Sequence, residues 1–147
     1  LMNNTNTTQS KSPKIKLDFK DSKYATGRRK RSIAKVWVKK GSGNIHVNGL
    51  KMNEYFKRPV HQIIVNRPLE ISDAANNYDV KCSVKGGGLS GQAGAIILGI
   101  SKALIEHDSA LKKNLKKDKL TTRDSRVVER KKYGHRKARR SFQFSKR

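Results

Sequence analysis

Apolar residues occupy every second position from Tyr78 to Val84, and the intervening positions are Asp, Lys and Ser. Because successive side chains of a β-strand point to opposite faces, this pattern predicts a half-buried strand over 78–85. Residues 32–38 are rich in strand-forming types and predict a second strand. A turn cluster at 41–44 separates that strand from the alternating residues 45–47. We therefore expect 32–38 and 45–47 to pair as a hairpin.

The helical pattern is clearest over 89–107, where apolar residues recur three and four positions apart. Such a stripe is typical of a helix that packs one side against a core. Two short helices are predicted over 51–58 and 60–67, because Pro59 separates them and Pro68 follows the second. Another short helix is predicted over 109–117. The elements together predict an α+β body with one sheet and helices on one of its faces.

Charge changes this picture from an ordinary small domain to a polycation. The 147 residues include 35 Lys and Arg against 11 Asp and Glu, which gives a formal net charge of +24. Hydrophobic residues make up 34%, below the roughly 45–50% of a typical globular domain. No stretch approaches the roughly 18 apolar residues that cross a bilayer. We therefore expect a polyanion as the partner, and no membrane.

The charge divides the chain into three parts. Residues 1–21 are polar with net charge +2 and are predicted to be disordered. Residues 22–121 have net charge +13 and contain most of the apolar pattern, so they are predicted to form the folded body. Residues 122–147 have net charge +9 and are predicted to form an extended tail that orders against its partner.

Four consecutive cations, residues 28–31, lie at the start of the first predicted strand. In an extended chain their side chains alternate between faces, so they cannot all face a core. A surrounding of phosphate groups explains them; a solvated strand end is the alternative. The lysines of 112–119 are predicted to form a basic helical face, again with plain solvation as the alternative.

The glycine-rich segment 86–91 fits the pattern G-x-G-x-x-G between a strand and a helix, which is the context of a dinucleotide-binding motif. The preceding strand alternates, however, whereas a central parallel strand is apolar on both faces. Further βαβ units are also missing from the sequence pattern. We therefore expect no nucleotide cofactor. The glycines predict either a close approach of RNA phosphate to the backbone or tight packing.

Other chemistry is sparse. The four histidines are far apart in sequence and form no metal-ligand pair, and one cysteine cannot build a metal site. Cys82 falls on the apolar side of its strand, which favours a buried position. We assign Trp37 to the core, with a stacking platform for bases as the alternative. The sequence predicts no catalytic site, no metal and no small-molecule substrate.

The tail alternates arginines with aromatic residues. The guanidinium group can grip a phosphate with two hydrogen bonds and can stack on bases. Tyr133, Phe142 and Phe144 offer further faces for unpaired bases. The tail therefore predicts contact with RNA.

Six short motifs follow one another in a fixed order along the chain. They are 25–30 (ATGRRK), 47–49 (VNG), 55–56 (YF), 84–95 (VKGGGLSGQAGA), 123–132 (RDSRVVERKK) and 143–147 (QFSKR). Together they resemble the family of the ninth protein of the small ribosomal subunit. Ile97 and Leu98 depart from the family pattern, where we expect a polar pair. The resemblance covers nearly all of 22–147.

The resemblance implies a two-layer α/β sandwich like the second domain of the fifth small-subunit protein, bound to rRNA and neighbouring proteins in the head of the subunit. It also implies that the tail threads through rRNA and reaches the tRNA in the peptidyl site, through Ser145, Lys146 and Arg147. The residues expected to contact small-subunit rRNA are Arg28, Arg29, Lys30, Arg31, Lys85, Gly86, Gly87, Gly88, Gln92, Arg123, Arg126, Arg130, Lys131, Lys132, Arg136, Lys137, Arg139 and Arg140.

Two further expectations concern the compartment and the competing class of protein. Segments 58–60 and 78–82, with the Asn/Lys-rich extension, favour a mitochondrial ribosome over a bacterial cytoplasmic one. A nucleoid or histone-like DNA-binding protein is the alternative that the charge alone leaves open.

Overall fold

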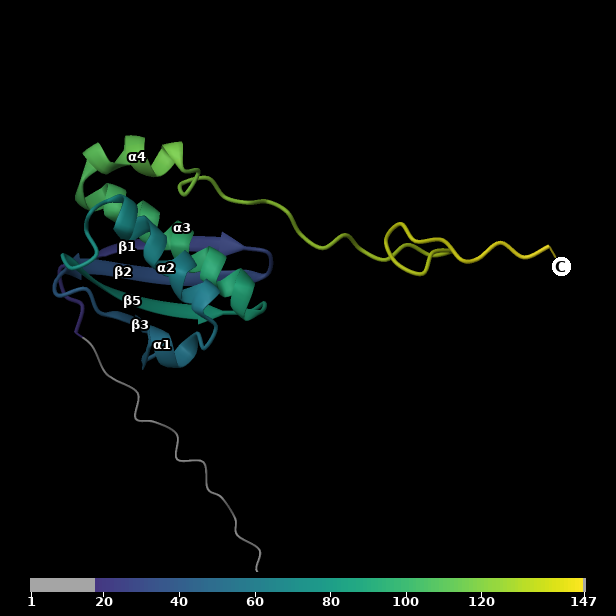
Figure 1. Cartoon of the computed structure of the whole chain (residues 1–147), viewed down its shortest axis with the longest axis horizontal. Coiled ribbons are helices and arrows are strands. Elements are labelled where there is room, and N and C mark those ends of the chain that lie inside the picture. The colour runs from purple at the N-terminus through teal and green to yellow at the C-terminus, as the bar shows by residue number, and fades with distance from the viewer. Residues whose placement is uncertain (1–17, 147) are drawn as a thin grey trace, which may run out of the picture.

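Five strands form one sheet in the spatial order β1-β2-β5-β3-β4 in the computed structural model, which describes residues 18–146 (Figure 1). The strands are β1 (Lys23–Arg29), β2 (Ser32–Lys40), β3 (Ile45–Val47), β4 (Leu50–Lys51) and β5 (Tyr78–Lys85). The helices are α1 (Met52–Tyr55), α2 (Pro59–Ile71), α3 (Leu89–His107) and α4 (Lys112–Lys117), with a 3₁₀ turn η1 (Ser109–Leu111) before α4. All neighbouring strands are antiparallel except β3 and β5, which are parallel.

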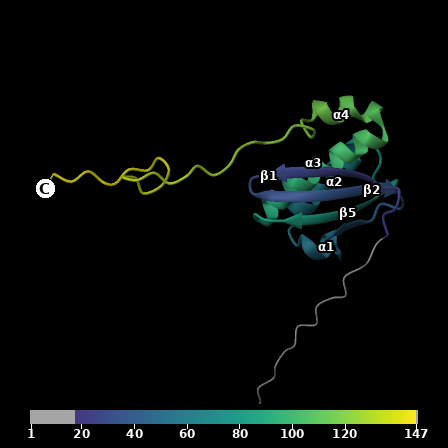
Figure 2. The same ribbon diagram turned by 180° about the vertical axis from the view of Figure 1, so that it is seen from behind.

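Helices α2 and α3 cover one face of the sheet, so the body has two layers (Figures 1 and 2). The core lies between the layers. Alternate residues of β2 and β5 point into it, and their partners come from α3, which is buried on most sides because both the sheet and α2 pack against it. The largest fully buried side chains include Val36, Val38 and Val80 of the sheet and Ile96, Ile100 and Leu104 of α3. The fold is thus the α+β arrangement expected, with helices on one face.

The strand 78–85 and the helix 89–107 are confirmed residue for residue. The short helix predicted over 109–117 is a 3₁₀ turn followed by α4. The two helices predicted around Pro59 have different bounds, because Pro59 begins α2 and Pro68 lies inside it. Pro is well placed in the first turn of a helix, where its missing N–H is not needed. The prediction that Pro68 ends the helix is wrong.

The hairpin between 32–38 and 45–47 is also wrong. Strand β5 lies between β2 and β3 and pairs with both, with Val36 opposite Cys82 and Val47 opposite Cys82 on the other side. The hairpin partner of β2 is instead β1, which the apolar pattern did not predict. The basic run 28–31 therefore does not begin the first strand. It ends β1, forms the turn at Lys30 and Arg31, and leads into β2.

Trp37 does not lie in the core. It is half-buried on the face of β2 opposite Val36 and Val38. Cys82 is buried as expected, at 2% exposure.

Beyond α4 the chain leaves the body and runs far from it, as Figure 1 shows. In the described part of this tail, His135 and Ser141 form an isolated antiparallel β-bridge. Residues 1–17 and Arg147 lie outside the described residues, so the disorder predicted for 1–21 mostly falls there. Among residues 18–146, no helix is both long and apolar enough to span a bilayer.

Candidate nucleic-acid interface

The β1–β2 turn and the glycine turn before α3 lie against each other at one end of the sheet. The Ser32 hydroxyl donates a hydrogen bond of 3.0 Å to the carbonyl of Gly86. A Cβ atom on Gly86 would lie 2.6 Å from the carbonyl oxygen of Arg31. The basic run and the glycine motif, which are separate in sequence, therefore form one surface with Arg28, Lys30 and Arg31 exposed.

Packing explains most of the glycines in this motif. Gly86 and Gly87 have φ angles of 74° and 62°, a region that side chains disfavour. A Cβ on Gly87 or on Gly91 would lie 2.1 Å or 2.8 Å from the Ser32 hydroxyl oxygen. Gly88 differs, because a Cβ there would meet no atom within 4 Å. It is exposed and caps the N-terminus of α3, where a phosphate could approach the backbone.

Gln92 holds the glycine turn in place. This residue is 9% exposed, and both polar atoms of its amide are hydrogen bonded. The Tyr55 hydroxyl donates to its Oε1 at 2.7 Å, and its Nε2 donates to the Gly86 carbonyl at 3.2 Å. Asn48 lies beside this network and hydrogen bonds to both backbone groups of Val84. The rRNA contact expected of Gln92 stays a prediction, and the structure shows Gln92 supporting its neighbours.

The root of the tail is joined to this same end of the sheet. Arg29 Nη2 lies 3.5 Å from Asp124 Oδ2, and Arg126 hydrogen bonds to both oxygens of that carboxylate at 2.8–3.2 Å. The hydrogen bonds from Arg126, followed by the charges of Arg126 and Arg29, hold the pKa of Asp124 well below its usual range. The carboxylate therefore stays ionised and joins cations of the body and the tail.

Two open basic hollows flank the Arg29–Asp124 pair. One of about 250 Å³ is lined by Arg28, Arg67 and Lys119 among apolar side chains that include Ile97 and Leu98. The other, of about 300 Å³, is lined by Lys30, Arg126 and Val127. Asp124 lines both hollows, but basic side chains outnumber it in each, so both linings attract anions such as phosphate.

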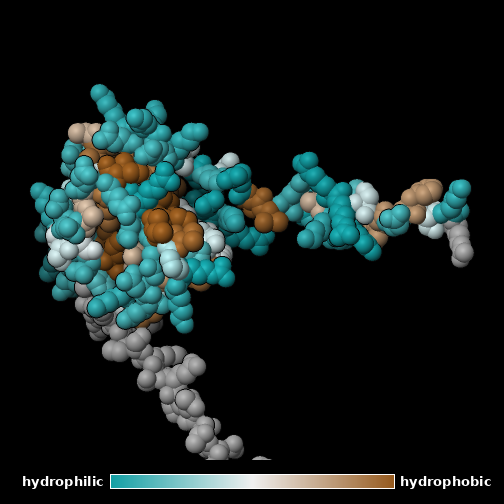
Figure 3. All heavy atoms as spheres, viewed as in Figure 1, coloured by the Kyte–Doolittle hydropathy of each residue, from teal (hydrophilic) through white to brown (hydrophobic). Residues whose placement is uncertain are grey.

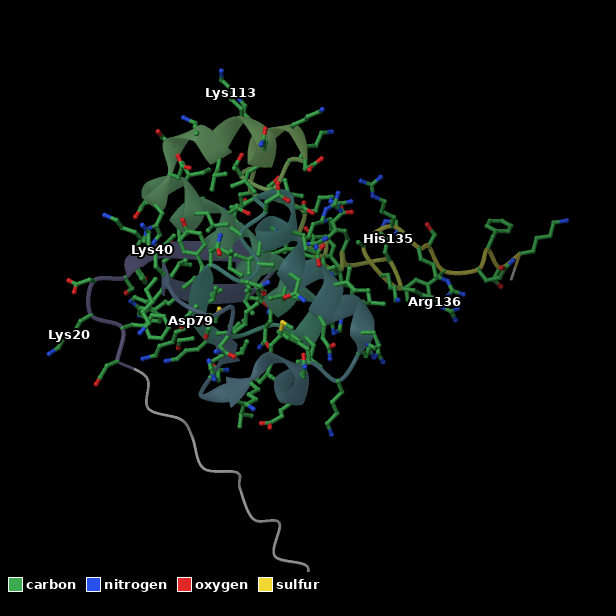
Figure 4. All side chains as sticks on the ribbon, turned by 60° about the vertical axis from the view of Figure 1, so that its left-hand side comes forward. Lys20, Lys40, Asp79, Lys113, His135 and Arg136 are labelled. Atoms are coloured by element: carbon green, nitrogen blue, oxygen red, sulfur yellow. The ribbon has the colours of Figure 1, made fainter. Side chains whose placement is uncertain are left out.

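Farther along, the tail folds back on itself around Glu129. The carboxylate of Glu129 lies 3.0 Å from Arg139 Nε and 3.8 Å from Lys132 Nζ. The loop so closed is drawn in Figure 4, where His135 and Arg136 are labelled, and Arg136 lies over the Phe142 ring at 5.7 Å. Each of the two acidic residues of the tail, Asp124 and Glu129, is thus in contact with at least one arginine. Figure 3 shows that the tail is mostly hydrophilic, with scattered apolar side chains.

Most of the residues predicted to contact RNA are exposed. These are Arg28, Lys30, Arg31, Lys85, Gly86, Gly87, Gly88, Arg123, Arg126, Arg130, Lys131, Arg136, Lys137, Arg139, Arg140, Ser145 and Lys146. Arg29 and Lys132 are half-buried, Gln92 is buried, and Arg147 lies outside the described residues. The structure brings Arg28–Arg31, the glycine turn and the tail root together, while residues from Arg130 onward lie away from the body.

Sequence reasoning missed Arg67, which lines the first hollow together with Lys119 of the basic segment 112–119. On the open face of the sheet it named Arg28 and Lys85 as RNA contacts. It did not name Lys35, Lys39 or Lys81, and it assigned Trp37 to the core. The alternation of β2 was the available signal, since Trp37 shares its phase with Lys35 and Lys39.

The described residues include no group of three His, Cys, Asp or Glu side chains placed to hold a metal ion. Burial raises the pKa of the Cys82 thiol far above its usual range, so this thiol is not a nucleophile in the folded body.

A small basic α+β body joined to an arginine-rich tail is typical of the class of proteins that bind nucleic acid. The family model described as ribosomal protein S9/S16 matches residues 27–147. The chain belongs to this family and is a structural protein of the small ribosomal subunit. The family is structural rather than catalytic, and its partners are rRNA and other ribosomal proteins.

Proposed function

We propose that the body binds small-subunit rRNA in the head of the subunit through the end of the sheet formed by Arg28–Arg31, Gly88 and the tail root. The observation that supports this most is the contact between three segments that are distant in sequence and all basic or open to phosphate. Phosphate contacts fix the position of a protein on RNA without reading its sequence. A structural protein needs this kind of binding.

Reconstituted small subunits test this proposal. Replacing Arg28, Lys30 and Arg31 together with Ala should reduce incorporation of the chain and expose rRNA nucleotides in the head to chemical probing. The matched control replaces Lys112, Lys113 and Lys116 of α4, which removes the same charge from another place. Equal incorporation of both triple variants would contradict the proposal, and co-sedimentation of the chain with nucleoids would favour a DNA-binding protein instead.

We also propose that the tail threads through rRNA and that Ser145, Lys146 and Arg147 contact the tRNA in the peptidyl site during translation. Two observations support this proposal. The tail is basic and exposed and extends away from the body, and the chain belongs to a ribosomal protein family. Deleting residues 145–147 should weaken retention of peptidyl-site tRNA on purified subunits while assembly proceeds. A variant with Lys116 and Lys117 changed to Ala is the charge-matched control, and unchanged tRNA retention in the deletion would contradict this role.

We also propose a more specific fold and a cellular compartment for this chain. The two-layer body should superpose on the second domain of the fifth small-subunit protein, which has the fold that the family resemblance implies. The ribosome should be mitochondrial, as the segments 58–60 and 78–82 favour. Fractionation of the source cells, followed by detection of the chain in mitochondrial or in bacterial-type cytoplasmic ribosomes, decides the compartment.

A further inference from the structure

The open face of the sheet carries a second set of side chains suited to RNA. Figure 2 shows β1, β2 and β5 from this side, with α2 and α3 behind them. Among the described residues, no helix covers this face. It presents the residues of β2 that alternate with the core positions, with their neighbours on β1 and β5.

Two aromatic rings lie side by side on this face. Tyr24 and Trp37 are direct partners in the β1–β2 register, and their ring centroids are 5.3 Å apart with an interplanar angle of 44°. Tyr24 is 43% exposed and Trp37 is half-buried, so the rings offer surface to solvent. On the next strand Lys81 is the register partner of Trp37, with its Nζ 5.8 Å from the indole ring. Phe19 lies close by, with Lys39 Nζ 4.9 Å from its ring centre.

A hollow continues from the aromatic pair along the same face. It has a volume of about 230 Å³ and is lined by Ile33, Lys35, Ser83 and Lys85. Ile33 lies four positions before Trp37 on β2, which corresponds to about 13 Å along the strand. The face therefore offers a stacking surface at one end, a small apolar depression at the other, and Lys35 between them.

Cations outnumber acids on this face. Among the residues of β1, β2 and β5 that point to this face, the basic ones are Arg28, Lys35, Lys39, Lys81 and Lys85, and the acidic one is Asp79. The carboxylate of Asp79 is engaged at the sheet edge, where the backbone N–H groups of Ser42 and Asn44 donate to it at 3.0 and 2.9 Å. Figure 4 labels Asp79 and, on the neighbouring strand, Lys40. The centre of the face is consequently positive.

We infer that this face binds single-stranded RNA, with bases stacked on Trp37 and Tyr24 and phosphates held by Lys35, Lys39 and Lys81. The inference deepens the proposed function, on which it rests, by adding a second RNA surface distinct from the basic end of the sheet. Stacking platforms next to lysines are the arrangement that binds unpaired nucleotides without sequence preference. A protein partner fits less well, because the centres of protein interfaces are depleted in charged residues.

Fluorescence gives a direct test, because Trp37 is the one tryptophan of the chain. The full chain is titrated with a single-stranded oligouridine of eight nucleotides and, separately, with a duplex RNA of equal charge. Single-stranded RNA should quench Trp37 emission in a saturable way, and the duplex should not. Equal quenching by both RNAs, or no quenching by either, would overturn the inference.

Variants give an independent readout through the anisotropy of labelled RNA. Trp37→Ala should weaken binding of the oligouridine about tenfold, the size expected for one lost base stack, and Trp37→Phe should restore most of it. The control removes Lys113, which lies on α4 away from this face. Because Trp37 lies outside the core, both Trp37 variants should fold, as circular dichroism can check. If Trp37→Ala does not fold, Tyr24→Ala replaces it, since Tyr24 is exposed, and this variant should weaken oligouridine binding in the same way.

The two proposals fail in different ways. If Trp37→Ala binds oligouridine as the unaltered chain does while the chain still assembles into small subunits, this inference is wrong and the proposed function stands. Failure of the unaltered chain to assemble would contradict the proposed function itself. Chemical crosslinks from Lys35 or Lys81 to another protein in intact subunits would also overturn the inference, and would assign the face to a protein neighbour.

Discussion

The guanidinium of Arg29, at the end of β1, lies 3.5 Å from the carboxylate of Asp124, where the tail begins. The aliphatic part of Arg29 crosses α3 at Gly94, where a Cβ atom would lie only 2.3 Å from Arg29 Cδ. A glycine at this position therefore makes room for the arginine. The pair connects the folded body to the segment that extends away from it, and we interpret it as the contact that sets the direction in which the tail leaves.

Removing the Arg29–Asp124 contact should loosen the root of the tail without unfolding the body. In Arg29→Ala, trypsin should cleave after Arg123 and Arg126 several times faster than in the unaltered chain. The thermal midpoint should change little, because both side chains of this pair are partly exposed to solvent and such ion pairs contribute little to the free energy of folding.

Arg28→Ala is the matched control, since Arg28 has no ion pair among the described residues. Equal cleavage rates in the two variants would show that Arg29 does not hold the tail. The contact should also persist at mildly acidic pH. The lowered pKa of Asp124 keeps its carboxylate charged until the pH falls well below the usual range of an aspartate, as carbon NMR of that carboxyl can follow.

Glycines in the body should differ sharply in their tolerance of a side chain. A Cβ on Gly27 would lie 1.8 Å from the carbonyl oxygen of Ala95 in α3, so Gly27→Ala must push the helix away from β1. We expect a loss of about 1–3 kcal/mol or more in the free energy of unfolding, measured by urea titration. Gly88→Ser should change it by less than about 1 kcal/mol, because that site is open and serine is a good helix N-cap. Similar losses in both variants would contradict this packing.

The network around Gln92 should contribute to stability. In Gln92→Ala the Tyr55 hydroxyl loses its acceptor and the Gly86 carbonyl loses a donor, and we expect a cost of about 1–3 kcal/mol in a urea titration. Gln143→Ala, which truncates an exposed glutamine of the tail, should cost nothing measurable. If Gln92→Ala were as stable as that control yet bound rRNA poorly, Gln92 would be an RNA contact and not a support.

Cys82 should make the folded state sensitive to high pH. Burial raises the pKa of its thiol, so the folded state keeps its proton while the unfolded chain loses it above about pH 8.5. Stability is therefore full below that pH and falls as the pH rises above it, by up to about 1.4 kcal/mol per pH unit.

Comparison with Cys82→Ala isolates this effect from the other groups that titrate at high pH. The stability difference between the two proteins should shrink as the pH rises from 8 to 10. A difference that stays constant would mean that the thiol is accessible when folded. Thiol reagents should then also label the native protein quickly, whereas we expect labelling only on unfolding.

The elements that the sequence predicted correctly are those whose pattern is local and strong. Strand β5 alternates through its full length, and α3 repeats its apolar stripe from Ala93 to Leu104, which is about three turns. Strand β1 was not predicted because its core-facing residues, Ala25 and Gly27, are too small to give an apolar pattern. The structure requires small residues there because α3 packs directly on β1, and a hydrophobicity pattern does not report such close packing.

The errors in pairing and in the site have a common physical cause, which is contact between residues distant in sequence. Nothing local to β2 and β3 shows that β5 will lie between them. The basic run and the tail were both assigned to RNA from their composition, yet the pairing of Arg29 with Asp124 exists only in the folded chain. Trp37 was assigned to the core, although the alternation along β2 puts it on the open face.

The position of β5 between β2 and β3 also constrains how the chain folds as it is synthesised. The β1–β2 hairpin is local and can form early, whereas β3 has no partner on its inner edge until residue 85 has emerged. Pairing between strands that are distant in sequence is slower than formation of a local hairpin. The basic turn is therefore complete before the body is, and a nascent chain would display its strongest RNA-attracting cluster while half of its sheet is still missing.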